Sequence, residues 1–167
     1  MLKIAVLGAS GIGKFHAREY MLAGTEVVAI LGSSKETSEK AAEDLSSEYG
    51  MHPKAYFDLD TLIQNESVDA VSVCTPPQLH YGQVKKCLIA GLHVMCEKPF
   101  VFDSDYHNSE SARELIKLSE EKKLILTVNT QWPSVLKYLK PLVDLSNVKD
   151  FFMYMQPPSY GKNMLID

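Results

Sequence analysis

A glycine-rich stretch near the start of the chain has the residue types needed to cradle phosphate groups. The sequence VLGASGIGKFHA, residues 6–17, places Gly8, Ser10 and Gly13 on the dinucleotide-binding fingerprint G-x-G-x-x-G, with serine at the middle position. The first glycine permits a tight turn, and the third lets the following helix pack closely on the strand. Ser10 is small and its hydroxyl can donate to a phosphate oxygen, while Gly11 keeps the loop permissive. A plain strand-to-helix turn is the alternative, and the surrounding pattern favours phosphate binding.

A second stretch bears on which dinucleotide is bound. Such sites usually carry Asp or Glu about 20 residues past the glycines, where the carboxylate holds the ribose hydroxyls. Here the sequence reads GSSKETSEK, and no carboxylate appears before Glu36. Ser33, Ser34 and Lys35 offer two hydroxyls and a cation, which suit a 2′-phosphate. The alternative is a solvated loop in which Ser34 or Thr37 caps the next helix. The missing acid favours NADP over NAD.

The elements that must position these residues follow an alternating pattern. Short apolar runs are expected as strands at residues 3–8, 26–32, 55–57, 69–75, 93–98 and 124–129. Amphipathic stretches are expected as helices at residues 15–22, 37–49, 79–90 and 109–121. The first, fourth and sixth runs are almost continuously apolar, which is typical of strands buried on both faces. The pattern predicts an α/β fold, a doubly wound parallel sheet.

Further candidate residues stand where the predicted strands end. Ligands of open parallel sheets bind outside the carboxyl ends of the strands, so these residues should converge with the glycine turn. Pro76 and Pro77 stop the fourth strand and could present a flat apolar face to a nicotinamide or ribose; a rigid turn before a helix is the equal alternative. The other residues at these ends are Cys74, Thr75, Glu97, Lys98 and Asn129.

Four stretches together resemble the Gfo/Idh/MocA family of nicotinamide-dependent oxidoreductases. They are GIGKFHA, VDAVSVCTPPQLHYGQV, AGLHVMCEKPF and TVNTQWP, and the resemblance covers essentially the whole chain. Its most specific element is Glu97-Lys98-Pro99 at the end of a strand. The resemblance implies a Rossmann-like domain, an NAD(P)-dependent dehydrogenase activity and a small sugar- or polyol-like substrate. Gln131 stands where family members often have Arg, which puts a substrate-contacting role there in doubt.

The resemblance also implies roles for individual residues. Lys98 is expected to be catalytic, because a partly desolvated lysine can move or stabilise a hydroxyl proton; a solvated loop cation is the alternative. His16 and His80 match family histidines, with packing or supporting roles expected for both. The full set expected at the cofactor is Gly8, Ser10, Gly11, Ile12, Gly13, Ser33, Ser34, Lys35, Cys74, Thr75, Pro76, His80, Glu97, Lys98 and Asn129.

Two domains are expected. Residues 1–130 would form the dinucleotide-binding domain, and residues 131–167 a connecting helix and the first strand of a truncated second α+β domain. Family members are about twice as long, and their second domain carries an Asp-x-x-x-His motif that GKNMLID approaches, with Asp167 as its aspartate. We therefore expect a domain cut from a longer enzyme and inactive alone. The apolar strand expected at residues 151–155 has no partner after it, so we expect a homo-oligomer.

Composition excludes several classes of protein. The 167 residues are 46% hydrophobic and 23% charged with a net charge of −4, and no dense basic cluster points to nucleic acid or an anionic membrane. No apolar run suits a signal peptide or membrane span, and Cys74, Cys87 and Cys96 lack metal-ligand spacing, so we expect a cytoplasmic protein with free thiols. No histidine pair has zinc-ligand spacing, so no metal site is expected. A non-catalytic dinucleotide-binding sensor or regulatory module, and a plain α/β interaction domain, remain as alternative functions.

Overall fold

The computed structural model describes residues 1–8, 10–102, 107–130, 138 and 141. Met1–Asn129 form one compact unit and Thr130–Asp167 a second. The fold below is that of the first unit. The helix and strand expected within residues 131–167 lie outside the described residues, apart from Tyr138 and Pro141.

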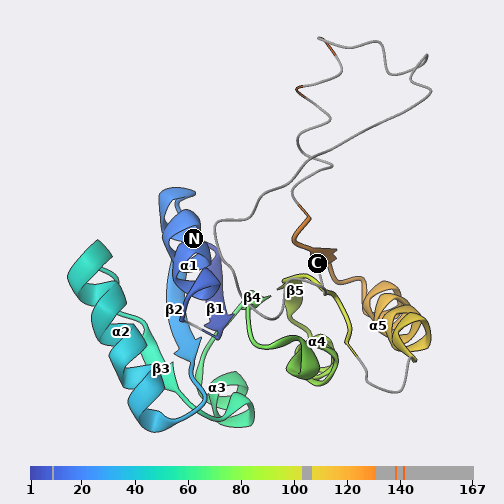
Figure 1. Ribbon diagram of the computed structural model, residues 1–167, viewed down its shortest axis with the longest axis horizontal. Helices are drawn as coiled ribbons and strands as arrows, with labels where there is room; N and C mark the ends of the chain where they lie inside the picture. The colour runs from blue at the N-terminus through green and yellow to red at the C-terminus, as the bar shows by residue number, and fades with distance from the viewer. Residues whose placement is uncertain (9, 103–106, 131–137, 139–140, 142–167) are drawn as a thin grey trace, which may run out of the picture. The chain divides into compact units, whose positions relative to one another are not determined.

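A parallel sheet of six strands forms the centre of the first unit. The strands are β1 (Lys3–Leu7), β2 (Glu26–Leu31), β3 (Lys54–Tyr56), β4 (Ala70–Val73), β5 (His93–Cys96) and β6 (Leu126–Val128). Their order across the sheet is β3-β2-β1-β4-β5-β6, and every neighbouring pair is parallel (Figure 1). The predicted strands and the doubly wound α/β fold are confirmed. The chain reverses its direction of winding between β1 and β4, and in folds of this kind ligands bind in a crevice at the carboxyl ends of the strands at such a reversal.

Helices cover the two faces of this sheet (Figure 1). They are α1 (Ile12–Leu22), α2 (Lys35–Tyr49), α3 (Leu59–Asn65), α4 (His80–Ile89) and α5 (Asn108–Lys122), with a short 3-10 turn, η1 (Pro77–Leu79), before α4. Residues of α1 and α2, among them Ala17 and Leu45, pack on one face of the sheet. Residues of α3, α4 and α5, among them Leu62, Leu88 and Leu115, pack on the other. None of the helices in the described part of the chain is long and apolar enough to span a bilayer.

Helix α3 was not predicted. It has only seven residues, and the side chain of Asp58 caps it by accepting from the backbone N–H of Thr61 at 2.8 Å. Leu59 and Leu62 are its buried residues. The helix is too short for a helical period to appear in the sequence, but Asp58 followed by apolar residues is a pattern that marks the start of a helix.

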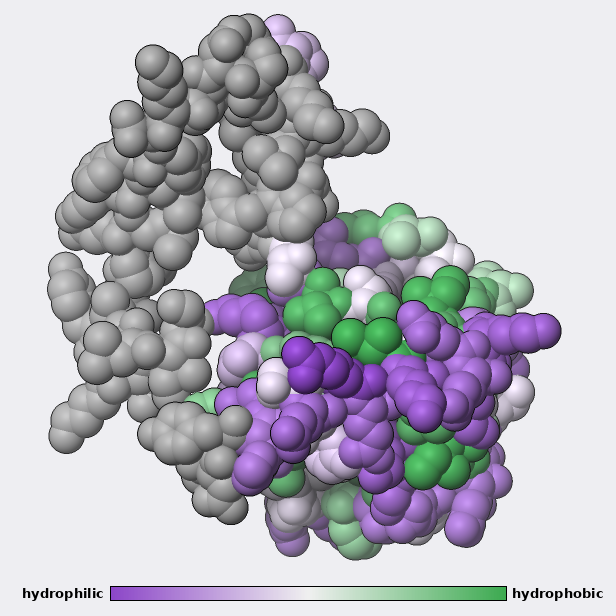
Figure 2. All heavy atoms as spheres, turned by 90° about the vertical axis from the view of Figure 1, so that its right-hand side faces the viewer, coloured by the Kyte–Doolittle hydropathy of each residue, from purple (hydrophilic) through white to green (hydrophobic). Residues whose placement is uncertain are grey.

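The sixth strand was expected to be buried on both faces, and this is wrong. In the structure β6 pairs with β5 at the edge of the sheet, and Thr127 at its centre is exposed. An edge strand is covered less completely than a central one, so an apolar run there need not indicate full burial. Figure 2 shows the face nearest α5, where hydrophobic areas lie among a predominantly hydrophilic surface.

Candidate dinucleotide site

The glycine turn between β1 and α1 is built by close backbone packing. Gly8 has φ +83°, and a Cβ on it would lie 2.6 Å from the carbonyl oxygen of Cys74 on β4. A Cβ on Gly13 would overlap the carbonyl oxygen of Gly8. Both positions therefore require glycine, and the turn brings the start of α1 against the end of β4.

The start of α1 is left open by the same turn. Gly11, with φ 56°, precedes the helix and provides no side-chain cap, and no acidic residue lies in the first turn. The residues Ser10, Gly11 and Ile12 are exposed. An uncapped helix start presents backbone N–H groups and the positive end of the helix dipole, which together suit an anion. The geometry fits the pyrophosphate predicted for Gly8, Ser10, Gly11, Ile12 and Gly13.

Of the residues after β2, some cap helix α2 and others are exposed to solvent. Ser34 and Thr37 cap α2 reciprocally: the Ser34 hydroxyl accepts from the backbone N–H of Thr37 at 3.2 Å, and Thr37 Oγ1 accepts from the Ser34 N–H at 2.9 Å. This is the capping alternative that the sequence left open for Ser34. Ser33 and Lys35 are exposed, and the Lys35 ammonium lies 3.8 Å from the Glu39 carboxylate.

The carboxylate of Glu36 also lies near this loop, and the sequence pattern alone did not assign it a role. Hydrogen bonds from its own backbone N–H and from the Ser34 hydroxyl hold the pKa of Glu36 below its ordinary value. An ionised carboxylate therefore lies in the first turn of α2, next to one of the hydroxyls assigned to a 2′-phosphate. No Asp or Glu stands at the strand end itself, and Glu36 is the first carboxylate after it.

The end of β4 contributes a buried thiol, a half-buried threonine and an exposed proline. Burial raises the pKa of the Cys74 thiol to about 11, so it stays protonated near neutral pH. Thr75 Oγ1 donates to Gln83 Oε1 at 2.6 Å, and Pro76 lies exposed beside it. Pro76 is thus accessible, while Cys74 is buried against the glycine turn.

His80 does not face the crevice. Its side chain is fully buried, with Nε2 2.8 Å from the carbonyl oxygen of Thr75 and Nδ1 2.8 Å from that of Pro99. Carbonyl oxygens can only accept, so both contacts are hydrogen bonds when both ring nitrogens carry a proton. His80 joins the loop after β4 to the loop after β5, which matches the supporting role predicted for it better than direct contact with a cofactor.

Glu97, Asn129 and His16 form a cluster at the carboxyl edge. The backbone N–H of Glu97 donates to Val73 and that of Asn129 to Cys96, which continues the strand pairing past β5 and β6. The Glu97 side chain is largely buried; its Oε1 accepts from Asn129 Nδ2 and lies 2.8 Å from His16 Nε2. The sequence placed Glu97 and Asn129 at one edge, but it did not connect them to His16.

Lys98 follows this cluster and is exposed. Its backbone N–H donates to Glu97 Oε2 at 3.3 Å, so the buried carboxylate holds the start of the Lys98-Pro99 turn. The desolvation expected for the Lys98 side chain is not provided by the described residues.

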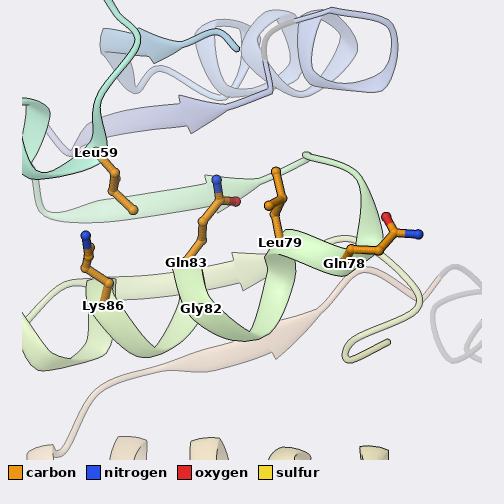
Figure 3. Close-up of a pocket in the computed structure, with 6 residues that line it drawn as sticks. All are labelled: Leu59, Gln78, Leu79, Gly82, Gln83 and Lys86. Carbon is orange, nitrogen blue, oxygen red and sulfur yellow. The ribbon is translucent and has the colours of Figure 1, made fainter. Parts of the chain in front are cut away.

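A hollow that the sequence did not reveal lies between α3 and α4. It has a volume of about 330 Å³, and Figure 3 shows Leu59 at the start of α3 pointing across it toward α4. Gln83 lines it too and accepts the Thr75 hydrogen bond, which links the hollow to the carboxyl end of β4. Its lining residues are Leu59, Gln78, Leu79, Gly82, Gln83 and Lys86. Within the described ranges no group of three or more His, Cys, Asp or Glu residues could hold a metal ion.

Comparison with known proteins agrees with this geometry. Residues 2–130 match the family model of the Gfo/Idh/MocA oxidoreductases, described as an oxidoreductase family with an NAD-binding Rossmann fold. UDP-N-acetylglucosamine 3-dehydrogenase of Acidithiobacillus ferrooxidans is 32% identical over 127 residues, which are 76% of this chain and 36% of that protein. Myo-inositol 2-dehydrogenase of Thermotoga maritima is 35% identical over 98 residues, 59% of this chain and 28% of that protein.

Solved structures show the same fold. A crystal structure of the Acidithiobacillus ferrooxidans enzyme superposes with a TM-score of 0.67 at 28% identity, over 84% of this chain and 43% of that one. Apo scyllo-inositol dehydrogenase from Lactobacillus casei has a TM-score of 0.71 at 23% identity, over 90% of this chain and 43% of that one. The chain thus spans well under half the length of these relatives. It belongs to the Gfo/Idh/MocA family of oxidoreductases and carries that family's NAD-binding Rossmann domain.

Proposed function

We propose that this chain is the cofactor domain of a dehydrogenase that transfers a hydride between a nicotinamide dinucleotide, NADP in preference to NAD, and a sugar- or polyol-like hydroxyl or carbonyl group. The observation that carries the proposal is the packing of Gly8 and Gly13 against the end of β4, beside an uncapped start of α1. Substrate class is supported by the relatives, which are named for UDP-N-acetylglucosamine and myo-inositol.

The described residues suit the parts of such a cofactor. The backbone of Ser10, Gly11 and Ile12 would hold the pyrophosphate, and Pro76 would offer an apolar surface to a ribose or nicotinamide. The hollow between α3 and α4, lined by Leu59 and Leu79, suits an apolar base. When bound, the nicotinamide supplies the group that gives or accepts the hydride.

Lys98 would manage the proton of the same reaction. Oxidation of an alcohol removes a hydride from its carbon and a proton from its oxygen. The Lys98 amine, when unprotonated, can take that proton and return it in the reverse direction. The proposal is supported by its position: Lys98 is exposed and directly follows the buried Glu97 after β5, and ligands of this kind of fold bind at the carboxyl ends of the strands.

Preference for NADP rests on Ser33 and Lys35. Both are exposed at the end of β2, where a 2′-phosphate would gain charge-assisted hydrogen bonds from a hydroxyl and an ammonium. A related D-xylose 1-dehydrogenase of Haloferax volcanii, 33% identical over 104 residues, is named for NADP. The negative charge of Glu36 would repel a 2′-phosphate and so opposes the preference, and the ratio of NADP to NAD affinity must therefore be measured.

Calorimetric titration of the chain with NADP, NAD and ATP at one salt concentration tests the proposal. We expect NADP to bind about tenfold or more tightly than NAD, as two charge-assisted hydrogen bonds would give. Equal or tighter binding of NAD would refute the NADP preference. Failure of every dinucleotide to bind would refute the function. A folded Ser10→Leu variant is the control, because its branched side chain would occupy the approach of the pyrophosphate, whereas Ser10→Gly should bind within a few-fold of the original chain.

A further inference from the structure

A chain of polar side chains runs from the interior of the α1 layer to Glu97. Tyr20 on α1 contacts Ser72 on β4, with 3.1 Å between their oxygens. Ser72 Oγ lies 2.9 Å from His16 Nδ1, and His16 Nε2 lies 2.8 Å from Glu97 Oε1. Asn129 donates to the same carboxylate oxygen from the end of β6. Residues from α1, β4, β5 and β6 therefore meet at one carboxylate.

The contacts determine where the protons lie. His16 Nε2 lies 2.8 Å from Glu97 Oε1 and 3.3 Å from Asn129 Nδ2; because the carboxylate contact is the shorter and Asn129 donates to the same carboxylate, we assign the hydrogen to Nε2, which donates to Glu97. In the neutral ring Nδ1 is then an acceptor, and the Ser72 hydroxyl donates to it. The Tyr20 hydroxyl donates in turn to Ser72 Oγ. Every bond in the chain thus points toward Glu97.

The groups around His16 keep this direction fixed. Burial raises the pKa of Tyr20, and burial also raises the pKa of the nearby Cys74, whose Sγ lies 3.5 Å from Ser72 Oγ. Neither group releases a proton near neutral pH. Met95, whose Sδ lies 3.0 Å from the Tyr20 hydroxyl, does not titrate. This series of hydrogen bonds from Tyr20 to Glu97 therefore orients the Glu97 carboxylate and does not conduct protons away from it.

The order Ser72, His16, Glu97 resembles that of a hydrolytic triad, but the burial of the serine excludes that chemistry. Ser72 is 1% exposed, so its hydroxyl cannot reach a substrate. A nucleophile must contact the atom that it attacks. The series of hydrogen bonds must therefore act at its other end, where the Glu97 carboxylate accepts a hydrogen bond from the backbone N–H of Lys98.

We propose that His16 is a positioning residue for the Glu97-Lys98 turn. By donating from Nε2 it fixes the Glu97 carboxylate, and through that carboxylate it fixes the backbone from which the Lys98 side chain extends. The Glu97 carboxylate selects the ring nitrogen that donates, because it can only accept, and the Ser72 hydroxyl completes the arrangement by donating to Nδ1. The effect on cofactor binding rests on the function proposed above, whereas the placement of the proton does not.

The proton placement is tested by nitrogen-15 NMR of the histidine rings in the intact chain, recorded where His16 is neutral. We expect His16 to carry its hydrogen on Nε2, with Nδ1 unprotonated and hydrogen-bonded. A Glu97→Gln variant identifies the resonance and should shift it. A His16 ring that carries its hydrogen on Nδ1 would overturn the proposal.

The positioning role is tested by exchanging His16 for side chains that keep or lose the donor. Gln places an amide close to the position of Nε2, so His16→Gln should retain NADP affinity within about threefold. Leu fills similar space without a donor, so His16→Leu should weaken NADP binding about tenfold, because the turn that carries Lys98 is no longer held in place for the cofactor. A residue that merely packs would give the opposite order, and that result would refute the role.

Two controls separate the possible failures. Should His16→Leu not fold, His16→Asn replaces it, because its shorter amide reaches Ser72 but not Glu97 and should lose affinity in the same way. If the unaltered chain binds no dinucleotide, the proposed function fails, and the NMR experiment still decides whether His16 donates to Glu97. If Gln, Leu and Asn all bind as the original chain does, the positioning role is refuted and the proposed function stands.

Discussion

A β-carbon on Gly13 would overlap the carbonyl oxygen of Gly8, so the first residues of α1 touch the end of β1 directly. The same turn lies against Cys74, since a β-carbon on Gly8 would be 2.6 Å from the Cys74 carbonyl oxygen. The glycine turn is therefore packed mainly against backbone, with the Cys74 side chain also close to Gly13.

Gly13→Ala should therefore destabilise the chain by about 1 to 3 kcal/mol, because the methyl group can be accommodated only by moving backbone. Gly82→Ala is the matched control. Gly82 lies within α4, and a Cβ there meets nothing within 4 Å, so alanine should raise the free energy of unfolding by about 0.5 to 1 kcal/mol. Urea denaturation of both variants measures the difference. Equal effects of the two substitutions would contradict the close packing.

Local patterns predicted most of this fold because each strand carries its own signal. The runs that became β1, β2, β4 and β5 are short and largely apolar; glycine directly follows β1 and β2, and a proline lies three residues after β4 and β5. The apolar run of β6 carries the same local signal, but its place at the edge depends on which strands pair. A pattern along one strand cannot report its neighbours.

The site shows a similar division. Gly8 and Gly13 could be predicted because a close approach demands a residue type. The bond between His16 and Glu97 could not, because residues 81 positions apart meet only after α1, β4 and β5 have packed. Likewise the sequence allowed Ser34 either to bind a 2′-phosphate or to cap α2, and only the hydrogen bonds between Ser34 and Thr37 show that it caps the helix.

His80 should be important for stability. Its ring nitrogens lie 2.8 Å from the carbonyl oxygens of Thr75 and Pro99, and the neutral ring can donate to one of them, so replacing it with leucine should cost about 1 to 3 kcal/mol. His80→Gln retains part of the donor capacity and should cost about half as much. The exposed His52, which contacts only the Ser46 hydroxyl among the described residues, provides the control, and His52→Leu should change the free energy of unfolding by less than about 0.5 kcal/mol. Similar losses of stability on substitution of His80 and His52 would contradict the conclusion that His80 joins the loop after β4 to the loop after β5.

The three thiols should be unreactive while the chain is folded. Burial raises the pKa of Cys74 to about 11 and those of Cys87 and Cys96 to about 12. Only the thiolate reacts with iodoacetamide, so alkylation at pH 8 should be much slower in the native chain than in urea. Rapid native alkylation of any of the three would contradict their burial.

The same shifts predict loss of stability in base. An unfolded thiol ionises near pH 9 while the folded thiol holds its proton, so the unfolded state gains charge first. Each thiol's contribution is complete below that pH and declines by about 1.4 kcal/mol per pH unit until the folded pKa is reached. Urea titrations between pH 8 and pH 11 measure the decline, and replacing Cys87 with alanine should reduce its slope.

Lys98→Met should separate binding from turnover. In a catalytically complete protein we expect kcat to fall about 10²-fold, because the proton from the substrate hydroxyl loses its acceptor, while NADP affinity falls by about tenfold at most, from the loss of the lysine's contact with the cofactor. Lys40→Met is the control, because Lys40 is exposed on α2 and pairs with Asp44, away from the glycine turn. An unchanged kcat would make Lys98 a surface cation, and a large loss of NADP affinity would assign it to binding.

Glu36 should limit the preference for NADP over NAD. Its carboxylate is held in the first turn of α2 by its own backbone N–H and by the Ser34 hydroxyl, and these bonds keep its pKa low, so it is ionised at neutral pH. A 2′-phosphate near Ser33 and Lys35 would be repelled by this charge, whereas ribose hydroxyls could donate to it. Glu36→Gln removes the charge with little change in size and should raise the ratio of NADP to NAD affinity by about three- to tenfold at low salt, with most of the gain lost at 0.5 M salt because exposed charges are screened. Glu43→Gln, an exposed position about two turns further along α2, should change the ratio by less than twofold. An identical ratio in the original chain and in Glu36→Gln would place the 2′ position of the ribose away from the start of α2, and would remove Ser33 and Lys35 from the cofactor site with it.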